Sequence, residues 1–260
     1  SLGSATPTAA REPDMRLQLS TWQEVEAYLG RSKGIIMPVG STEQHGPNGL
    51  IGTDAICPET IADGVAAKGD VLVGPTLSIV MAQHHMAFAG TITYRPSTFI
   101  AVLKDVIGSL ERHGFERIYF LNGHGGNIAT ITTAFSEIYA ERSMAGEKGV
   151  LRCRLSNWFA GRRTKQLARE LYGNSEGRHA TPSEVSVSFY AHPEAVKHAQ
   201  MEPKVAPVGE IRDALDYRRQ FPDGRIGSDP SLASVEDGKR LFEASVEDVA
   251  EDYAAFLAEG

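Results

Sequence analysis

Short apolar runs alternate with longer stretches of helical periodicity along the chain. Residues 34–39, 70–76 and 117–121 are rich in Ile and Val and stop at a Gly or Pro signal, and residues 150–155 form a fourth candidate. Runs of this length and composition are typical of parallel strands that are buried on both faces. The sequence therefore predicts a mostly parallel central sheet.

Apolar residues at helical spacing fill the intervals between these runs. They predict helices over residues 21–29, 57–68, 97–113 and 128–144. Ser20 is the expected N-cap of the first helix and Gln23 its capping-box partner, and each of the other three helices ends at a glycine. Because strands and helices alternate, right-handed crossovers should place helices on both faces of the sheet. The predicted fold class is α/β, a three-layer α/β/α sandwich.

The C-terminal third of the chain differs from this pattern. Residues 203–230 are rich in Pro, Gly and Asp, which predicts a long excursion over the surface, as a lid or as a contact to another subunit. Residues 235–258 predict a last helix with one apolar face. That face consists of Phe242, Val246, Val249, Tyr253 and Phe256. We expect residues 15–260 to form a single domain after a disordered leader at residues 1–14.

The composition is that of an ordinary globular protein and argues against several functional classes. Of 260 residues, 42% are hydrophobic and 23% are charged, and the formal net charge is -7. The basic residues form no stripe that would neutralise a phosphate backbone, so nucleic-acid binding is not expected. The densest basic tract, from Arg152 to Lys165, is predicted to be a solvated helix face. No apolar window reaches the roughly 18 residues of a membrane span, so no membrane partner is expected.

The two cysteines indicate the cellular compartment. Cys57 and Cys153 lie far apart in sequence, in apolar stretches, without a CxxC pattern. Such cysteines are typical of buried free thiols in a reducing compartment. The N-terminal segment also lacks an apolar core of signal-peptide length. The expected location is therefore the cytoplasm.

The segment directly after the first predicted strand carries the first candidate chemistry. It reads GSTEQHGP from Gly40 to Pro47, and Asp54 follows after a short loop. Ligands of open parallel sheets bind at the carboxyl ends of the strands. Glu43 and His45 are two residues apart, so on an extended segment they project to the same side and could reach one metal centre. The alternative is a polar turn, with Asp54 as a helix N-cap.

A histidine stands among glycines at the carboxyl end of another predicted strand. Residues 122–127 read NGHGGN and are followed by a helix. The glycines around His124 let the backbone fold tightly around a ligand. The alternative is a turn that cradles a phosphate, although the segment has neither a GxGxxG pattern nor a Walker lysine.

The third candidate segment is RHATPSEVS, residues 178–186. Pro182 is suited to the first turn of a helix that Thr181 would cap, which places Glu184 in that turn and His179 on the preceding loop. His179 and Glu184 can then face one cavity. The alternative for Glu184 is an interaction with the helix dipole only.

The donor types restrict the choice of metal. Carboxylate oxygens combined with neutral imidazoles suit zinc or manganese. A thiolate-free set with only one histidine would instead favour magnesium or calcium. The candidate segments together hold more than one histidine.

In this order and on these strand ends, the patterns EQHGP, GTDA, NGHGGN and HAxxxExS resemble the creatininase (creatinine amidohydrolase) family. The resemblance covers roughly residues 20–195. It implies an α/β/α fold, a homohexamer, and two divalent metal ions bridged by a carboxylate and a water. Zinc and manganese are the metals it implies, with iron as a third option.

The resemblance also assigns metal-ligand roles position by position. Asp54 resembles the ligand that bridges both ions. Glu43 and His124 resemble the residues that complete one site, and His45 resembles a ligand of the other. Creatininase carries a Glu two residues after the His of its NGH pattern, where this chain has Gly126.

Two further residues acquire roles from the resemblance. The fifth ligand is expected to be Glu184, as in family members with the NGHGGN form, and Glu184 is also a candidate catalytic residue. His179 resembles the residue that moves protons in the ring-opening reaction. The substrate-binding residues of creatininase are not evident at Asn174 to Gly177, just before His179, so creatinine is not the expected substrate.

Substrate contacts are expected from three other positions. Residues 88–92, FAGTI, resemble the family's FPGTI segment, and His85 falls where a pocket histidine is expected. Ser78 could line the pocket through its hydroxyl, and Gly125 lies in the glycine turn beside the expected metal site. His84 is expected to be a surface or core residue instead, because neighbouring residues of an extended segment point to opposite faces.

The expected function is metal-dependent hydrolysis of a C–N bond in a small cyclic amide, a formamide or a related amide. In this scheme a bridging hydroxide attacks the carbonyl, and His179 protonates the leaving nitrogen. One alternative is a relative that cleaves a modified peptide during cofactor maturation. Another is a non-catalytic protein that binds a metal or ligand on the same scaffold.

Overall fold

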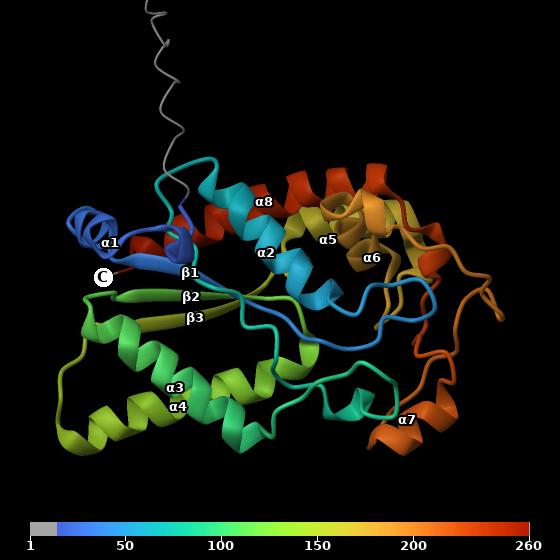
Figure 1. Ribbon diagram of the computed structural model, residues 1–260, viewed down its shortest axis with the longest axis horizontal. Coiled ribbons are helices and arrows are strands. Elements are labelled where there is room, and N and C mark those ends of the chain that lie inside the picture. The colour runs from blue at the N-terminus through green and yellow to red at the C-terminus, as the bar shows by residue number, and fades with distance from the viewer. Residues whose placement is uncertain (1–14, 260) are drawn as a thin grey trace, which may run out of the picture.

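The computed structural model describes residues 15–259, so the expected leader at residues 1–14 lies outside the described residues. A parallel sheet of three strands forms the centre, in the order β1 (Gly34–Val39), β2 (Arg117–Asn122) and β3 (Arg152–Asn157). Figure 1 shows helices α3 and α4 on one side of the sheet and helices α2 and α8 on the other. The predicted three-layer α/β/α fold is confirmed.

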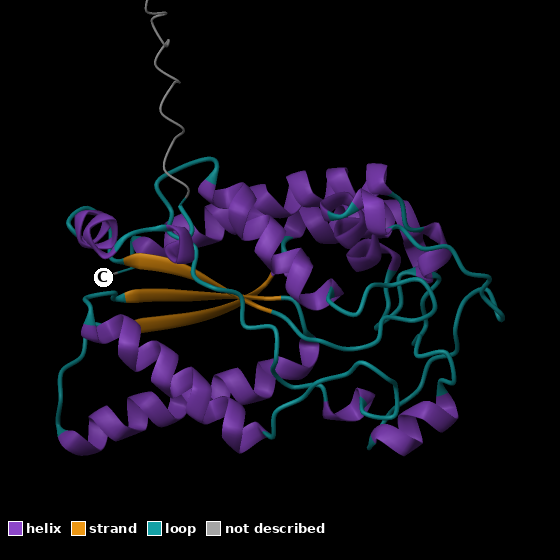
Figure 2. Ribbon diagram, in the orientation of Figure 1, coloured by secondary structure: helices purple, strands orange, loops and turns teal. Residues whose placement is uncertain are grey.

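Eight α-helices are described in residues 15–259. They are α1 (Trp22–Leu29), α2 (Thr53–Ala66), α3 (Pro96–Arg112), α4 (Ile128–Ala145), α5 (Arg162–Tyr172), α6 (Pro182–Ala191), α7 (Ala214–Gln220) and α8 (Val235–Leu257). Figure 2 shows that the strands run from one end of the molecule to its middle, and that loops and short helices fill the other end. The candidate site lies where the strands end.

The sheet separates two apolar cores. Alternate residues of β1 point to opposite faces, so Ile35 packs with α3 and α4 residues whereas Ile36 packs with α2 and α8 residues. All six residues of β1 are buried. This burial on both faces explains why the strand reads as an uninterrupted apolar run.

The prediction of a strand over residues 70–76 is wrong. This segment lies parallel to β1 but pairs with it only at isolated bridges, Ile36 with Val73 and Val39 with Leu77. Between the two bridges stands Pro75, which has no N–H group to donate to a ladder. The fourth candidate is correct in kind, but its strand spans Arg152–Asn157 instead of residues 150–155.

The starts of α1 and α2 differ from prediction. Thr21, not Ser20, caps α1, and Glu24 supplies the reciprocal hydrogen bond of the capping box. Helix α2 begins at Thr53, four residues before the predicted start at 57. Asp54 therefore lies in the first turn of a helix, where the backbone holds its carboxylate in a fixed direction.

Residues 203–230 pack more closely against the rest of the molecule than the predicted surface excursion would. They contain α7, and Tyr217, Phe221 and Ile226 form a small apolar cluster with Phe88. The side chain of Arg225 is fully buried and donates to the carbonyl oxygens of Lys204 and Pro203, at 2.8 Å each. The segment is a packed wall of the molecule, and its contact with another subunit stays a prediction.

The basic tract from Arg152 to Lys165 is not one solvated helix face. Arg154 belongs to strand β3 and pairs with Asp252 of α8 at 2.9 Å. Arg163 of α5 pairs with Asp248 of α8 at 3.0 Å. Both ion pairs fasten neighbouring elements to α8.

Both cysteines are free thiols, as predicted. Cys57 is buried in α2 and Cys153 is half-buried in β3. None of the helices in the described part of the chain combines the length and the apolar character that a bilayer crossing requires.

Candidate metal-dependent active site

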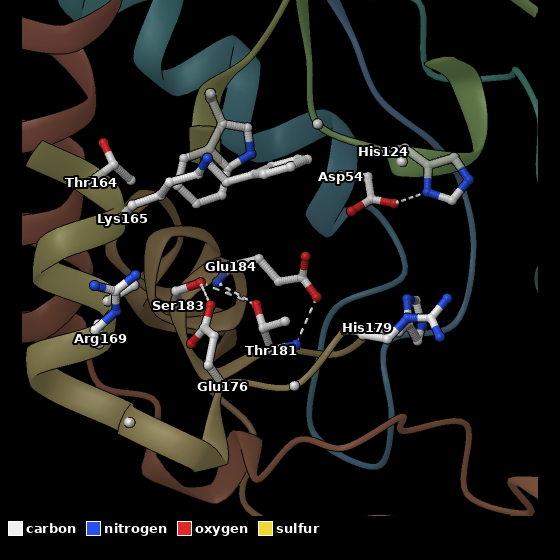
Figure 3. A pocket seen from close by; sticks show the side chains of 18 residues that line it. Asp54, His124, Thr164, Lys165, Arg169, Glu176, His179, Thr181, Ser183 and Glu184 are labelled. Carbon is white, nitrogen blue, oxygen red and sulfur yellow. Dashed lines mark hydrogen bonds and ion pairs between the residues drawn. The ribbon is translucent and has the colours of Figure 1, made fainter. Parts of the chain in front are cut away.

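Five predicted ligands converge at the carboxyl end of the sheet. Glu43 and His45 come from the loop after β1, Asp54 from the first turn of α2, His124 from the loop after β2, and Glu184 from the first turn of α6. Figure 3 shows Asp54, His124 and Glu184 around one hollow. Three regions of the chain, around residues 43–54, 124 and 184, thus bring these side chains together.

One group of ligands consists of Glu43, Asp54 and His124. The Nδ1 atom of His124 lies 3.2 Å from Oε1 of Glu43 and 3.0 Å from Oδ2 of Asp54. All three residues are buried, and one ligand atom of each lies within 4.8 Å of the others. This separation is small enough for a single metal ion to contact all three.

A second group consists of His45, Asp54 and Glu184. The Nε2 atom of His45 lies 3.0 Å from Oδ1 of Asp54 and 3.8 Å from Oε1 of Glu184. The two oxygens of Asp54 therefore face different groups, Oδ1 the second and Oδ2 the first. This arrangement agrees with the expectation that Asp54 bridges two ions.

Unpartnered buried atoms show that this donor set suits metal ions. Three buried ligand atoms have no hydrogen-bond partner of good geometry among residues 15–259. They are Glu43 Oε1, Asp54 Oδ2 and His124 Nε2. Burying such atoms without a partner costs free energy. Three carboxylates and two imidazoles without a thiolate match the preferences of zinc and manganese. A pair of divalent cations therefore fits the residues present.

The electrostatics of the metal-free site agree with this fit. Burial lowers the pKa of His45, but Asp54 and Glu184 outweigh it and raise that pKa to about 10. Burial also lowers the pKa of His124, but Glu43 and Asp54 outweigh this effect and raise that pKa to about 9. The protein without metal thus holds protons where cations would sit, so metal binding should release them.

His179 lies beside both ligand groups. Its Nε2 atom is 2.8 Å from the carbonyl oxygen of Gln44 and its Nδ1 atom is 3.9 Å from Oε1 of Glu43. Burial and the neighbouring His85 and His45 hold the pKa of His179 well below its ordinary value. The ring is therefore neutral, and because a carbonyl oxygen can only accept, its contact with Nε2 favours the tautomer with the proton on Nε2 and the lone pair on Nδ1; the side-chain amide nitrogen of Gln44 also lies 3.0 Å from Nε2.

Glu184 belongs to the capping box of α6 and also to a candidate ligand group. Its Oε1 accepts the backbone N–H of Thr181 at 2.7 Å, and the Thr181 hydroxyl accepts the backbone N–H of Glu184 at 3.2 Å. This capping box confirms the predicted start of α6 and fixes the carboxylate. Burial, reinforced by Asp54, raises the pKa of Glu184 to about 8.

Comparison with known proteins identifies the family. Residues 18–253 match the family model described as creatininase, creatinine amidohydrolase. The chain belongs to the creatininase family. The family proteins that it resembles include hydrolases of more than one kind, so membership supports a hydrolase without naming the substrate.

Two curated relatives illustrate that range. A mycofactocin precursor peptide peptidase from Mycobacterium ulcerans is 28% identical over 82% of each chain. A creatinine amidohydrolase from Pseudomonas putida is 26% identical over 89% of this chain and 93% of its own. The chain is thus similar over most of its length to a peptidase and to an amidohydrolase.

Solved creatininase structures share the fold. A crystal structure of creatinine amidohydrolase has a TM-score of 0.82 and 22% identity, and the match covers 95% of this chain and 99% of that one. Creatininase structures named as Zn-Zn type and as Mn each have a TM-score of 0.80 and 23% identity. Each of these two matches covers 95% of this chain, and they cover 99% and 100% of the respective creatininase chains.

The structure explains the glycine that departs from creatininase. A Cβ atom at Gly126 would lie 2.4 Å from Nε2 of His124 and 3.1 Å from two of its ring carbons. The imidazole thus occupies the space where a side chain at position 126 would begin. In this creatininase-family chain the fifth candidate ligand comes from α6 instead.

The three residues expected to contact the substrate, Gly125, His85 and Ser78, lie in three different places. The hollow next to the ligands has a volume of about 520 Å³, and Gly125 and His179 line it. His85 is buried behind the site, with Nε2 3.0 Å from Oε1 of Glu43. Ser78 does not line this cavity; it lies at a separate hollow beside α2. Ser78 directly follows Leu77, which still pairs with Val39 of β1, and its carbonyl oxygen accepts the hydroxyl of Thr42 at 2.8 Å, so the chain passes the site while the Ser78 side chain lies at the hollow beside α2.

The sequence did not indicate the contacts that three residues make around the site. The Gln44 side-chain amide lies 3.0 Å from Nδ1 of His85 and 3.1 Å from the carbonyl oxygen of Gly224, and Tyr217 donates to the same carbonyl at 2.7 Å. The EQH pattern could have drawn attention to Gln44, but no local signal marks Tyr217. His84, expected to be a surface or core residue, is half-buried, and its ring stacks on that of His124 with the centroids 5.8 Å apart.

Proposed function

We propose that this creatininase-family protein hydrolyses a C–N bond of an amide in a small molecule, with two divalent metal ions as cofactors. The observation that carries the proposal is that two ligand groups share Asp54 beside a cavity lined by His179. Glu43 and His124 would hold one ion with Asp54, and His45 and Glu184 the other. The Zn-Zn and Mn creatininase structures support zinc and manganese as the metals.

Metal ions at this site would polarise the amide carbonyl and lower the pKa of water. The protein itself supplies the proton transfer. His179 lines the cavity as a neutral base whose Nδ1 lone pair is free, so it can take a proton and return it to the leaving nitrogen. The contact of Nε2 with the Gln44 carbonyl favours the tautomer that this role requires.

Glu184 is the second candidate for the acid/base role. In the metal-free protein its pKa of about 8 keeps the carboxyl group protonated near neutral pH. The Glu43, His45 and His179 side chains also form a third group with ligand-compatible separations. Exchanging the roles of His179 and Glu184 is therefore the specific alternative, and variants of the two residues distinguish it.

A panel of amides tests the proposal directly. Protein loaded with zinc or manganese would be incubated with cyclic amides, formamides and short peptides, and released amine and acid would be quantified. Hydrolysis of small amides that stops when a chelator is added is the expected result. Cleavage of peptides alone would favour a peptidase, which the cavity of about 520 Å³ and the peptidase relative make the second candidate function.

We also propose that the protein is a cytoplasmic homo-oligomer, a hexamer, in which residues 203–230 meet a neighbouring subunit. The free thiols of Cys57 and Cys153 support a reducing compartment. The exposed side chains of Val208 and Leu215 lie in the same segment, at 76% and 77% exposure, and would be covered in such an interface. Light scattering that gives the mass of one 28.1 kDa chain at micromolar concentration would contradict it.

A further inference from the structure

One face of helix α5 forms a wall of the active-site cavity. Thr164, Lys165, Ala168 and Arg169 line it, and their spacing of one, three and one places them on a single side of the helix. Figure 3 shows Lys165 and Arg169 extending from this helix on the side of the cavity that lies away from Asp54 and His124. Lys165 and Arg169 are four residues apart, so their side chains are neighbours on the helix surface.

The orientation of this face is fixed by contacts with α8. The backbone N–H and the hydroxyl of Thr164 both donate to Oδ2 of Asp248, each at 2.9 Å. The Thr164 hydroxyl also lies 3.1 Å from that of Ser245. Arg163 pairs with Asp248 and Glu251 on the α8 side. The helix therefore cannot turn the Lys165 side away from the cavity without losing these bonds.

The two cations on this wall have no acidic partner. Within residues 15–259 no carboxylate lies within 4.0 Å of the charged atoms of Lys165 or Arg169, although Arg163 on the same helix forms ion pairs. Arg178 also lines the cavity, but it pairs with Glu210 at 3.1 Å. The α5 wall thus offers two free positive charges to whatever enters.

The two ends of the cavity carry opposite charges, and Trp158 and Phe159 also line it. One end holds the carboxylates and imidazoles around Asp54, where the proposed metal ions would face the amide. The other end holds Lys165 and Arg169. Glu176 also lines the cavity, but its Oε1 accepts the hydroxyl of Ser183, and among residues 15–259 it forms no ion pair with Lys165 or Arg169.

We propose that Lys165 and Arg169 bind an anionic group of the substrate, so that the natural substrate is an amide that carries a carboxylate or a phosphate. This inference rests on the proposed function, because it assumes that the amide lies at the metal end of the same cavity. Arg169 can hold either anion with two parallel N–H donors, and Lys165 adds a point charge. The pair would orient the substrate with its amide toward Asp54 and Glu184.

Matched amides that differ only in charge test the proposal. Metal-loaded protein would be titrated calorimetrically with N-formylglycine against N-formylglycinamide, and with pyroglutamate against its carboxamide. N-formylaminoethyl phosphate forms a third arm that separates phosphate from carboxylate. We expect each acid to bind about 10-fold more tightly than its neutral partner, from two partly solvated charge pairs.

Variants of α5 distinguish anion binding by this helix from anion binding by the metal end of the cavity, which also attracts anions. The double variant with Lys165→Gln and Arg169→Gln should abolish the preference for the acid. The double variant with Lys165→Glu and Arg169→Glu should invert that preference. Arg162→Gln is the matched control, because Arg162 lies on the same helix and is exposed but does not line the cavity. It should retain the preference. Metal content and circular dichroism should be unchanged in all three proteins, since these side chains are exposed.

Several outcomes would overturn the inference. Equal affinity of wild-type protein for acid and carboxamide would do so, as would a preference that survives in the double Gln variant, or no binding of any acid at millimolar concentration. Formate release measured on the same samples separates this inference from the proposed function. Hydrolysis without charge preference removes only the anion subsite, whereas charge-dependent binding without hydrolysis removes only the proposed amidohydrolase.

Discussion

Asp54→Asn is the substitution that most directly tests the two-metal arrangement. The carboxylate oxygens lie 3.0 Å from Nε2 of His45 and 3.0 Å from Nδ1 of His124, so one side chain faces both ligand groups. Asn keeps the shape and one oxygen but removes the negative charge. The perturbation therefore acts on the charge between the two sites and leaves packing nearly unchanged.

The size of the effect follows from the charge that is lost. A unit charge interacts with another about 4 Å away by about 4 kcal/mol at an effective dielectric constant of about 20. At about 1.4 kcal/mol per tenfold change, this corresponds to a loss of at least roughly 10³-fold in affinity at each site, because each ion carries two unit charges. Both metal ions should therefore be weakened together. In Glu184→Gln only the site that contains His45 should lose affinity.

Metal analysis by mass spectrometry measures this difference. Wild-type and variant proteins would be dialysed against the same buffered concentration of free zinc or manganese, set so that the wild type is just saturated. We expect about two ions per chain in the wild type, close to none in Asp54→Asn and about one in Glu184→Gln. Circular dichroism of each sample would show that the fold is retained.

Two results would refute this reasoning. If Asp54→Asn kept one ion at normal affinity, Asp54 would serve a single site and the bridging role would be wrong. If Glu184→Gln kept both ions, Glu184 would be no ligand and the acid/base role would pass to it.

Three further predictions follow from single contacts. His179→Asn should keep both metals and lower turnover by about 10²- to 10⁴-fold in steady-state kinetics, and loss of metal would instead make His179 a ligand. Gly126→Ala should weaken metal binding about 10-fold or more in the same dialysis, because its Cβ would meet His124 at 2.4 Å, whereas Gly125→Ala, with no neighbouring atom within 4 Å, should not. Burial raises the pKa of Glu176 to about 6 from 4.5, so the folded state keeps a proton that the unfolded chain has lost, and stability falls as pH rises between these values. Glu176→Gln should remove that fall and stabilise metal-free protein at pH 7 by about 1 to 2 kcal/mol in chemical denaturation, and an unchanged pH profile would contradict this.

The sequence alone determined most of the elements and the types of ligand, although it indicated neither α5 nor α7. Buried strands appear as continuous apolar runs because both faces of β1 are covered, and the Thr181, Pro182 and Glu184 pattern predicts the start of α6 because a capping box needs only neighbouring residues. The candidate ligands follow the carboxyl ends of predicted parallel strands, which meet at one edge of the sheet. These signals are local, or follow from a general rule of topology, so a single sequence carries them.

Tertiary packing alone decided what surrounds those ligands. Tyr217 reaches the site because residues 203–230 fold back as a wall, and nothing near Tyr217 in the sequence shows this. Lys165 and Arg169 look like an ordinary solvated pair until contacts between α5 and α8 direct them into the cavity. Ser78 was misplaced for the same reason, because the direction of its side chain depends on distant neighbours. The reaction chemistry thus lies in local motifs, whereas the pocket wall depends on contacts between residues far apart in the chain.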